Sequence, residues 1–317
     1  MNDRSHRTIR VLFDERVREG SVEHYWHFML GYFLPLHAWL FSSARDGVSG
    51  PHLLLQNSGP IMNRLLEVSL GTLGIDHEFC EDCSLHPDSG LNLPAYARQS
   101  VDPFAPLRWK ENVLIPRWDL LFSNRADGLT MVNSAQRFEL LQKFDFLQRK
   151  IRSAIPAPGC CDPMRISGSY LVLERSEQPE FYNQHGNAKV KGYGKGRRSL
   201  TNLEEAVAYL KEAGVKVMRY EPGAHSFGCQ VRHFSSCKGV IGQRGAEFLG
   251  LFWMKPRSLA VLINQSEFSN IPPPAKLALF KKITYQQIEL EPAQAGSSLM
   301  PIAQVLEVVK QHNESEL

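Results

Sequence analysis

Arginine and glycine residues gather at the ends of expected strands in the C-terminal half of the chain. Arg175 ends the apolar run SYLVLER, and Arg244 lies between Gly242 and Gly245 in VIGQRGAE. Glycine lets a backbone approach a ligand closely, and the planar guanidinium of arginine pairs well with phosphate oxygens. The pattern favours a site for an anionic ligand such as a diphosphate.

A second basic segment precedes the helix expected at residues 199–214. Arg198 comes just before this helix, and Thr201 or Asn202 is a suitable N-cap residue. Residues 244–254 are expected to form another helix, and the N–H groups at its amino end favour an anion. A Gly-x-Arg-Gly turn alone is common, and Arg198 also fits an exposed basic face. The order of these elements therefore supports the prediction more than any single element does.

The segments that carry these residues alternate between expected strands and helices. Strands are expected at 169–175, 215–220, 238–242 and 258–264, with helices at 199–214, 227–237 and 244–254. Residues 270–292 are expected to be a proline-rich connector, and 301–313 a final amphipathic helix. The alternation predicts a parallel, doubly wound sheet, which binds ligands at the carboxyl ends of its strands.

The N-terminal half has a similar α/β pattern. An edge strand is expected at 7–13, and buried strands at 52–56 and 113–115. Helices are expected at 23–40, 61–73 and 134–153, the first with a break or bend at Pro35. The Pro, Gly and Cys segment 154–163 is the expected boundary. We predict α/β domains at 1–157 and 158–295 and a C-terminal helix at 296–317. The expected architecture is two Rossmann-like domains facing a cleft, with the final helix packing back on the N-terminal domain.

Composition and charge argue against several classes of protein. The 317 residues are 43% hydrophobic and 22% charged, which is ordinary for a globular chain, and the net charge of +3 is too small to favour nucleic acid. The charged N-terminus lacks the apolar core of a secretory signal, so a cytoplasmic location is expected. The apolar segment 28–41 is shorter than a membrane span and contains Pro35 and His37. It is expected to be a buried core segment, with a peripheral membrane contact as the alternative.

Six cysteines are too few for a disulfide scaffold in a chain of this length. We expect Cys80 and Cys83 to be loop thiols in a reducing compartment. The alternative is a zinc site at Cys80-x-x-Cys83, between His77 and His86, but the chain has no second CxxC pair.

Several segments resemble the motifs of glycosyltransferase family sixty-one, which includes capsular-polysaccharide transferases and plant xylosyltransferases. The family patterns are a strand with Ser-Arg, R-x-(I/L)-x-N-E, a glutamine-containing helix entry, G-x-H-G-A-x-L-x-N and, upstream, N-Y-(Y/W)-H-F before L-P. The corresponding segments are Glu174-Arg175-Ser176, Arg198-Ser-Leu-Thr-Asn202, Ser226 to Phe234 with Gln230, Gly242 to Gly250, and His24-Tyr25-Trp26-His27-Phe28 followed by Leu34-Pro35. The resemblance covers most of the chain.

The chain departs from this pattern at four places. Arg244 stands where the family has His, Leu203 replaces a Glu, Leu249-Gly250 replaces a frequent Thr-Asn, and Leu262 occupies a frequently acidic position. A divergent member is therefore expected. The alternative is a non-catalytic, nucleotide-binding scaffold of a polysaccharide pathway.

The resemblance implies a GT-B fold and a transfer that inverts the anomeric carbon, with a hexosyl or pentosyl group moved. The implied partners are a nucleoside-diphosphate sugar, first of all a UDP-sugar, as co-substrate and a glycan or glycoconjugate acceptor, without a cofactor or nucleic acid. Residues 158–295 would bind the donor, and 1–157 would lie on the acceptor side. No D-x-D triplet occurs, so we expect a metal-independent reaction. The predicted donor-binding residues are Arg175, Arg198, Asn202, Gln230, Gln243, Arg244, Gly245, Ala246 and Glu247.

Two residues are candidates for the base that takes the proton of the acceptor hydroxyl. His27 is the first, because Glu23 lies one helical turn earlier and a carboxylate there orients and raises the pKa of an imidazole. The alternative is a core histidine beside Trp26 and Phe28. Asp119, after an expected strand end, is the second candidate, and it equally fits a helix cap. A nicotinamide-dependent enzyme fits only the α/β texture, since the strand–GxGxxG–helix unit is missing.

Overall fold

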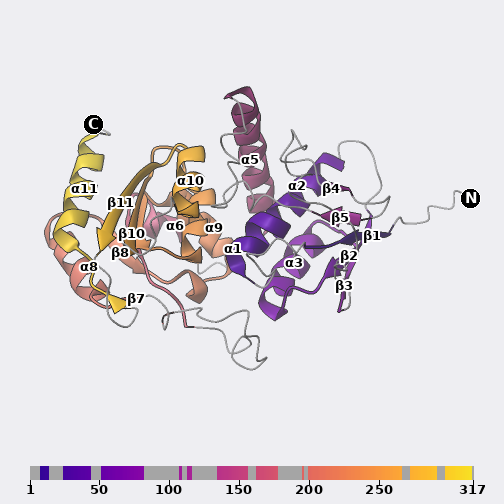
Figure 1. The fold of residues 1–317 in the computed structure, drawn as a ribbon, viewed down its shortest axis with the longest axis horizontal. Coiled ribbons are helices and arrows are strands. Elements are labelled where there is room, and N and C mark those ends of the chain that lie inside the picture. Colours follow the sequence, from indigo (N-terminus) through magenta and orange to yellow (C-terminus); the bar gives the residue numbers. More distant parts are fainter. Residues whose placement is uncertain are drawn as a thin grey trace, which may run out of the picture. The chain divides into compact units, whose positions relative to one another are not determined.

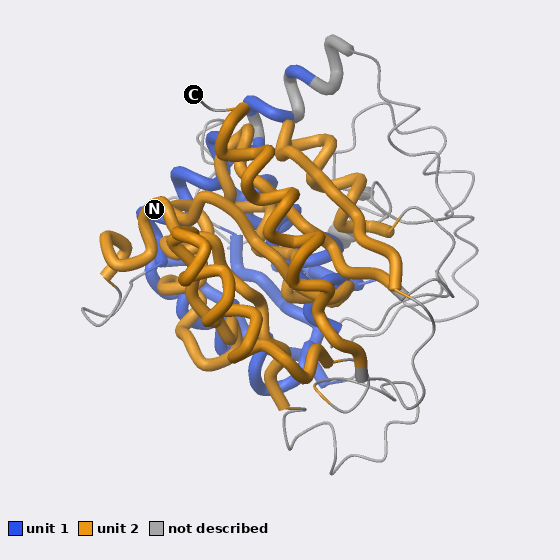
Figure 2. Tube along the Cα trace, turned by 90° about the vertical axis from the view of Figure 1, so that its left-hand side faces the viewer, with its two compact units in different colours: residues 1–155 blue, residues 156–317 orange. Residues whose placement is uncertain are grey.

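In the computed structural model the chain forms two compact units, residues 1–155 and 156–317 (Figure 2). The described residues are 8–13, 24–43, 51–81, 107–108, 113–115, 134–155, 162–177, 195, 199–265, 272–290 and 297–315. Each unit has a predominantly parallel β-sheet with helices around it (Figure 1). The α/β class predicted from the sequence is confirmed.

The sheet of the first unit has the strand order β3-β2-β1-β5-β4. Its strands are β1 (Thr8–Val11), β2 (His52–Gln56), β3 (His77–Cys80), β4 (Leu107–Arg108) and β5 (Val113–Ile115), and only β4 is antiparallel to its neighbour. The helices are α1 (Tyr25–Phe28), the π-helix η1 (Met29–Phe33), α2 (Leu34–Ser43), α3 (Pro60–Thr72) and α5 (Ser134–Ala154). The prediction that β1 is an edge strand is wrong, because β1 pairs with β2 on one side and β5 on the other.

The first long helix passes through Pro35 without a break. Proline has no N–H to donate to the carbonyl four residues earlier, and the turn before it, η1, widens to π geometry. The predicted break at Pro35 is therefore absent, and a widened turn precedes the proline. Tyr32 in η1 donates its hydroxyl hydrogen to the Val11 carbonyl at 2.7 Å and accepts the Gln56 N–H at 3.0 Å. The helix is thereby tied to the carboxyl ends of β1 and β2.

The sheet of the second unit is wholly parallel and has the order β11-β10-β9-β6-β8. Its strands are β6 (Tyr170–Leu173), β8 (Val217–Tyr220), β9 (Gly239–Gln243), β10 (Leu259–Gln265) and β11 (Thr284–Leu290), and β7 (Ser199–Leu200) pairs separately with β12 (Ser297–Ser298). The helices are α6 (Pro163–Ile166), α8 (Leu203–Glu212), η5 (Pro222–Ala224), α9 (Phe227–Ser236), η6 (Ala246–Phe252), α10 (Pro273–Phe280) and α11 (Ile302–Ser315). The predicted parallel sheet is confirmed in this unit.

Helices cover both faces of this sheet. On one face α8 and α11 lie side by side, and Leu210, Val305 and Val309 are fully buried there (Figure 1). On the other face lie α9, η6 and α10. Gly250 in η6 packs so closely on the Phe234 ring of α9 that a Cβ at residue 250 would overlap the ring.

Two expectations for the second unit differ from the structure. Residues 270–292 are not a connector but contain α10 and β11, whose alternating polar residues suit an edge strand. The helix expected at 244–254 is the 3₁₀-helix η6. Within its own unit the final helix α11 contacts α8 and β10, and His312 hydrogen-bonds the Tyr170 hydroxyl at 2.9 Å. Its packing on the N-terminal domain stays a prediction.

Cys80 takes part in a disulfide, so the expectation of a loop thiol there is wrong, and Cys229 in α9 also takes part in a disulfide. Cys237 is a free, buried thiol whose pKa is raised by burial to about 12. Disulfides persist in oxidising environments and are rare in the cytosol. The cytoplasmic location therefore loses its support from reduced thiols and stays a prediction. Within the described residues no helix is both long and apolar enough to cross a bilayer.

Two buried histidines make stability depend on pH. Burial lowers the pKa of His37 to about 4, and burial together with the charge of His225 lowers the pKa of His233 to about 4. In the unfolded chain both bind a proton near pH 6.5. The unfolded state therefore gains protons first as the pH falls, and stability is lost between about pH 6.5 and 4, by about 3 kcal/mol for each histidine.

We expect His37→Phe to remove this loss for the first unit, because Phe suits the neighbouring Phe33 and Phe41 rings and does not titrate. Urea unfolding of both proteins at pH 7 and pH 4.5 measures the effect. The same loss of stability in wild type and variant would contradict the assignment.

Candidate functional site

The strand order of the second unit creates a crevice between β6 and β9. The chain passes from β6 to β8 on one side of β6 and then returns to β9 on its other side. In open parallel sheets this reversal separates the loops that leave the carboxyl ends of the two strands, and ligands bind there. Glu174 and Arg175 follow β6, and Gln243 ends β9.

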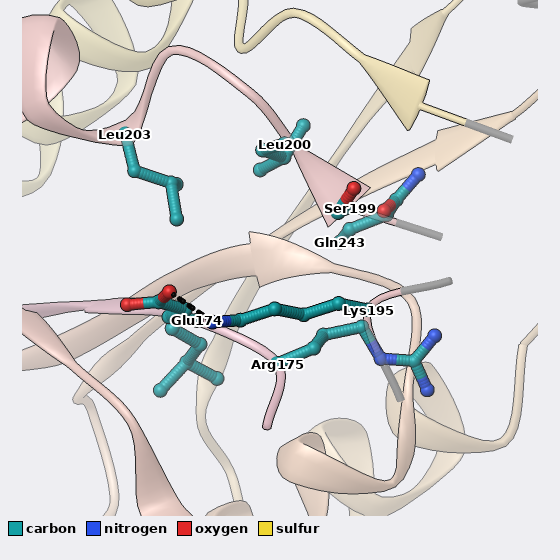
Figure 3. A pocket seen from close by; sticks show the side chains of 8 residues that line it. Glu174, Arg175, Lys195, Ser199, Leu200, Leu203 and Gln243 are labelled. Atoms are coloured by element: carbon teal, nitrogen blue, oxygen red, sulfur yellow. Dashed lines mark ion pairs between the residues drawn. The ribbon is translucent and has the colours of Figure 1, made fainter. Parts of the chain in front are cut away.

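A pocket of about 170 Å³ lies at this point (Figure 3). Leu173, Leu200 and Leu203 supply apolar surface. The polar surface comes from four side chains beside Gln243, namely Glu174, Arg175, Lys195 and Ser199. A pocket with apolar walls and a few polar groups is the usual form of a small-molecule site.

The carboxylate of Glu174 has its charge compensated within the protein. Arg219 donates to both of its oxygens, and the Lys195 ammonium lies 3.0 Å from Oε1. Hydrogen bonds from Arg219 hold the pKa of the Glu174 carboxyl below its usual range against the opposing effect of burial, and Lys195 adds to the lowering. A backbone bond from Lys195 N–H to the Ser176 carbonyl fixes the lysine beside the pocket. Glu174 therefore does not present an uncompensated negative charge to an anion.

Arg175 contributes a partly satisfied guanidinium. Its Nε lies 3.2 Å from Oε1 of Glu247, and only 13% of the arginine side chain is exposed. The Nη1 atom is buried and has no hydrogen-bond partner within the described residues. A buried N–H of a charged group without an acceptor is costly, and a phosphate oxygen is a suitable acceptor.

Gln243 has an unsatisfied amide in the same pocket. The residue is 5% exposed, and neither Nε2 nor Oε1 has a partner among the described residues. The amide offers both a donor and an acceptor. Arg175 and Gln243 therefore both line the pocket and both carry buried polar atoms that have no partner among the described residues.

Arg244 takes a different direction from Arg175. It is not among the residues that line the pocket. The backbone N–H of Arg244 donates to the Ile263 carbonyl of β10. Burial raises the pKa of Tyr285 on β11, and the positive charge of Arg244 lowers it in part. The structure thus does not bring Arg244 and Arg175 together in this pocket.

The backbone after Arg244 does not form the expected α-helical amino end. Gly245 is extended and lies beside the Arg175 guanidinium, and Ala246 begins the 3₁₀-helix η6. The seven residues of η6 form a short 3₁₀-helix in place of the expected α-helix, which weakens the argument from a helix dipole. The binding of a donor by Gly245, Ala246 and the basic residues stays a prediction.

Asn202 and Gln230 make structural hydrogen bonds. Asn202 accepts from the Met300 N–H at 2.7 Å and donates to the Met300 carbonyl at 3.2 Å. Gln230 donates to the His225 carbonyl at 3.0 Å, before α9. Their predicted contact with a donor stays a prediction.

The residues expected to act as base are less fully defined by the structure. His27 lies in α1, half-buried, with its ring 5.0 Å from that of His24 in an edge contact. Glu23, Asp119 and Arg198 lie outside the described residues. The assignment of the base stays a prediction.

Sequence reasoning missed Glu174, Lys195 and Ser199. A charged residue directly after the buried run YLVL was a usable signal for Glu174. For Lys195 and Ser199 the glycine-rich segment offered no such signal, because their place depends on contacts with Glu174 and with the strand β12.

Comparison with known proteins assigns the chain to a family. The family model described as Glycosyltransferase 61 matches residues 25–261, from α1 to β10. The chain belongs to the glycosyltransferase 61 family. The resemblance predicted from the sequence motifs is confirmed, and the assignment supports a glycosyltransferase. A search of curated proteins finds no match to the chain.

We expect Asn202→Ala to lower stability. The buried Met300 backbone loses both partners, which costs about 1–3 kcal/mol. Urea unfolding measures this change, and Gln311→Ala, on the exposed side of α11, is the control that changes stability by less than about 0.5 kcal/mol. A stable Asn202→Ala protein that binds nucleotide more weakly would instead support the predicted donor contact.

Proposed function

We propose that the protein transfers a sugar, with inversion, from a nucleoside-diphosphate sugar to a hydroxyl group of a glycan or other acceptor. A UDP-sugar is the first candidate for the donor. The observation that supports this proposal most is the pocket at the carboxyl ends of β6 and β9. There Arg175 Nη1 and the Gln243 amide are buried without partners in the described structure. Membership of the glycosyltransferase 61 family supplies the reaction class.

The departing diphosphate is the group that Arg175 would bind. As the acceptor oxygen attacks the anomeric carbon, the bond from that carbon to the diphosphate breaks and negative charge moves to the leaving group. A fixed guanidinium that faces this charge lowers the barrier, since it needs no reorganisation during the reaction. In this proposal Arg175 does the work that a metal ion does in other transferases, and the reaction is metal-independent.

The Gln243 amide and the leucine walls suit the uncharged parts of the donor. Gln243 pairs with a group that has a donor and an acceptor side by side, and Leu173, Leu200 and Leu203 pack on an apolar surface. We assign the donor to the second unit and the acceptor to the first, as in a GT-B enzyme. His27 or Asp119 takes the proton of the acceptor hydroxyl.

The test is nucleotide binding followed by transfer. A panel of UDP-, GDP- and CMP-sugars is screened by thermal shift, because a ligand that binds only the folded state raises its melting temperature. Release of nucleotide in the presence of EDTA then measures the reaction. Absence of binding and turnover with every donor would contradict the proposal, and tight binding without transfer would favour a nucleotide-binding scaffold.

We expect Arg175→Ala to weaken nucleoside-diphosphate binding at least tenfold, because a charge-assisted hydrogen bond contributes about 1.5–3 kcal/mol. Calorimetry measures the affinity. The matched control is Arg165→Ala. Arg165 is exposed in α6, just before β6, and therefore lies near the amino ends of the strands, away from the pocket at their carboxyl ends. Equal affinities of the two variants would show that the pocket is not the diphosphate site.

A further inference from the structure

Glu247 reaches back over Gly245 to contact Arg175. Its Oε1 lies 3.2 Å from Arg175 Nε, and the two side chains are 18% and 13% exposed. A Cβ at residue 245 would overlap Glu247 Oε2 and would lie 3.1 Å from Arg175 Nη2. Gly245 has a φ of −171°, which any residue can adopt, so the glycine is needed here for space rather than for backbone conformation.

The contact with Glu247 uses the Nε edge of the guanidinium and leaves the Nη1 atom for another partner. Glu247 accepts from Nε, while Nη1 is buried without a partner among the described residues. An arginine held through Nε cannot rotate about its last bonds without losing this hydrogen bond. The Nη1 N–H groups consequently keep one direction, which is the condition for a preorganised ligand contact.

We propose that Glu247 is a positioning residue that stays on Arg175 in the donor complex and fixes the direction of Nη1. Gly245 provides the space that this carboxylate needs. The inference rests on the proposed donor site and assigns Glu247 a role that differs from the direct contact with the donor predicted from the sequence. This positioning role also differs from that of a simple counterion, because a counterion would weaken the attraction of Arg175 for an anion.

Two substitutions remove the same contact in different ways. Glu247→Ala deletes the carboxylate, and Gly245→Ala displaces it, because the new methyl group occupies its position. The methyl group overlaps the end of the Glu247 side chain and lies 3.1 Å from Arg175 Nη2, so only the ends of two flexible side chains have to move and the fold is retained. Gly71→Ala in α3 is the matched control, since a Cβ there meets nothing within 4 Å among the described atoms.

The experiment measures the affinity of the tightest binder among UDP, GDP and CDP by calorimetry, together with donor KM and kcat. We expect Glu247→Ala and Gly245→Ala each to weaken binding about tenfold, and the double variant to be no weaker than Glu247→Ala alone. Glu247→Gln keeps an acceptor for Nε and recovers most of the affinity. In an Arg175→Ala background, Glu247→Ala has no further effect. Gly71→Ala binds like the wild type.

Three results would overturn the inference. Affinity in Glu247→Ala equal to or tighter than wild type would make the carboxylate a bystander or a counterion. If the loss of affinity in the Gly245→Ala, Glu247→Ala double variant is the product of the two single losses, the two residues act separately. A Glu247→Ala loss that persists in the Arg175→Ala background would make Glu247 a direct ligand. In all three cases the wild type still binds and Arg175→Ala still loses binding, so the donor site stands. A wild type that binds none of the nucleotides would overturn both proposals.

Discussion

A guanidinium that is removed from water needs an acceptor for each of its N–H groups, and Arg175 has this need met only in part. Glu247 accepts from Nε, whereas Nη1 has no partner within the described residues. The Gln243 amide at the end of the neighbouring strand is buried in the same condition. Buried polar groups without partners are uncommon and costly in native proteins. A ligand with anionic oxygens and polar groups would satisfy both side chains at once.

The fold makes this arrangement available at the carboxyl ends of β6 and β9. The strand order reverses at β6, so the chain leaves β6 and β9 in opposite directions and opens a space between their carboxyl ends. A carboxylate at that point, Glu174, would repel an anion, but Arg219 and Lys195 neutralise it. The positive charge of Arg175 therefore acts in the pocket without competition from Glu174. The pairing of β7 with β12 and the Asn202–Met300 bonds hold the leucine wall in its place.

Much of this unit is readable from the sequence, because apolar runs such as YLVL and LAVLIN leave little doubt about buried parallel strands. The family motifs identified the reaction class, and Arg175 and Gln243, which were predicted to bind the donor, both line the pocket. The edge strand β11 was missed because its alternating polar residues lack an apolar run. The position of Arg244 could not be predicted, because the side chain of a residue just after β9 can lie toward β6 or toward β10 according to the local packing. The bonds of Asn202 join residues far apart in the chain, and no local pattern records them.

The most direct measurement of the central claim is a crystal structure of the protein with a bound nucleoside diphosphate. The account predicts a phosphate oxygen at about 2.8 Å from Arg175 Nη1, the usual length of such a charged hydrogen bond. It also predicts that Glu247 still contacts Nε and that the Gln243 amide has acquired a partner. A diphosphate bound to Arg244 on the β10 side, with Arg175 unchanged, would contradict it.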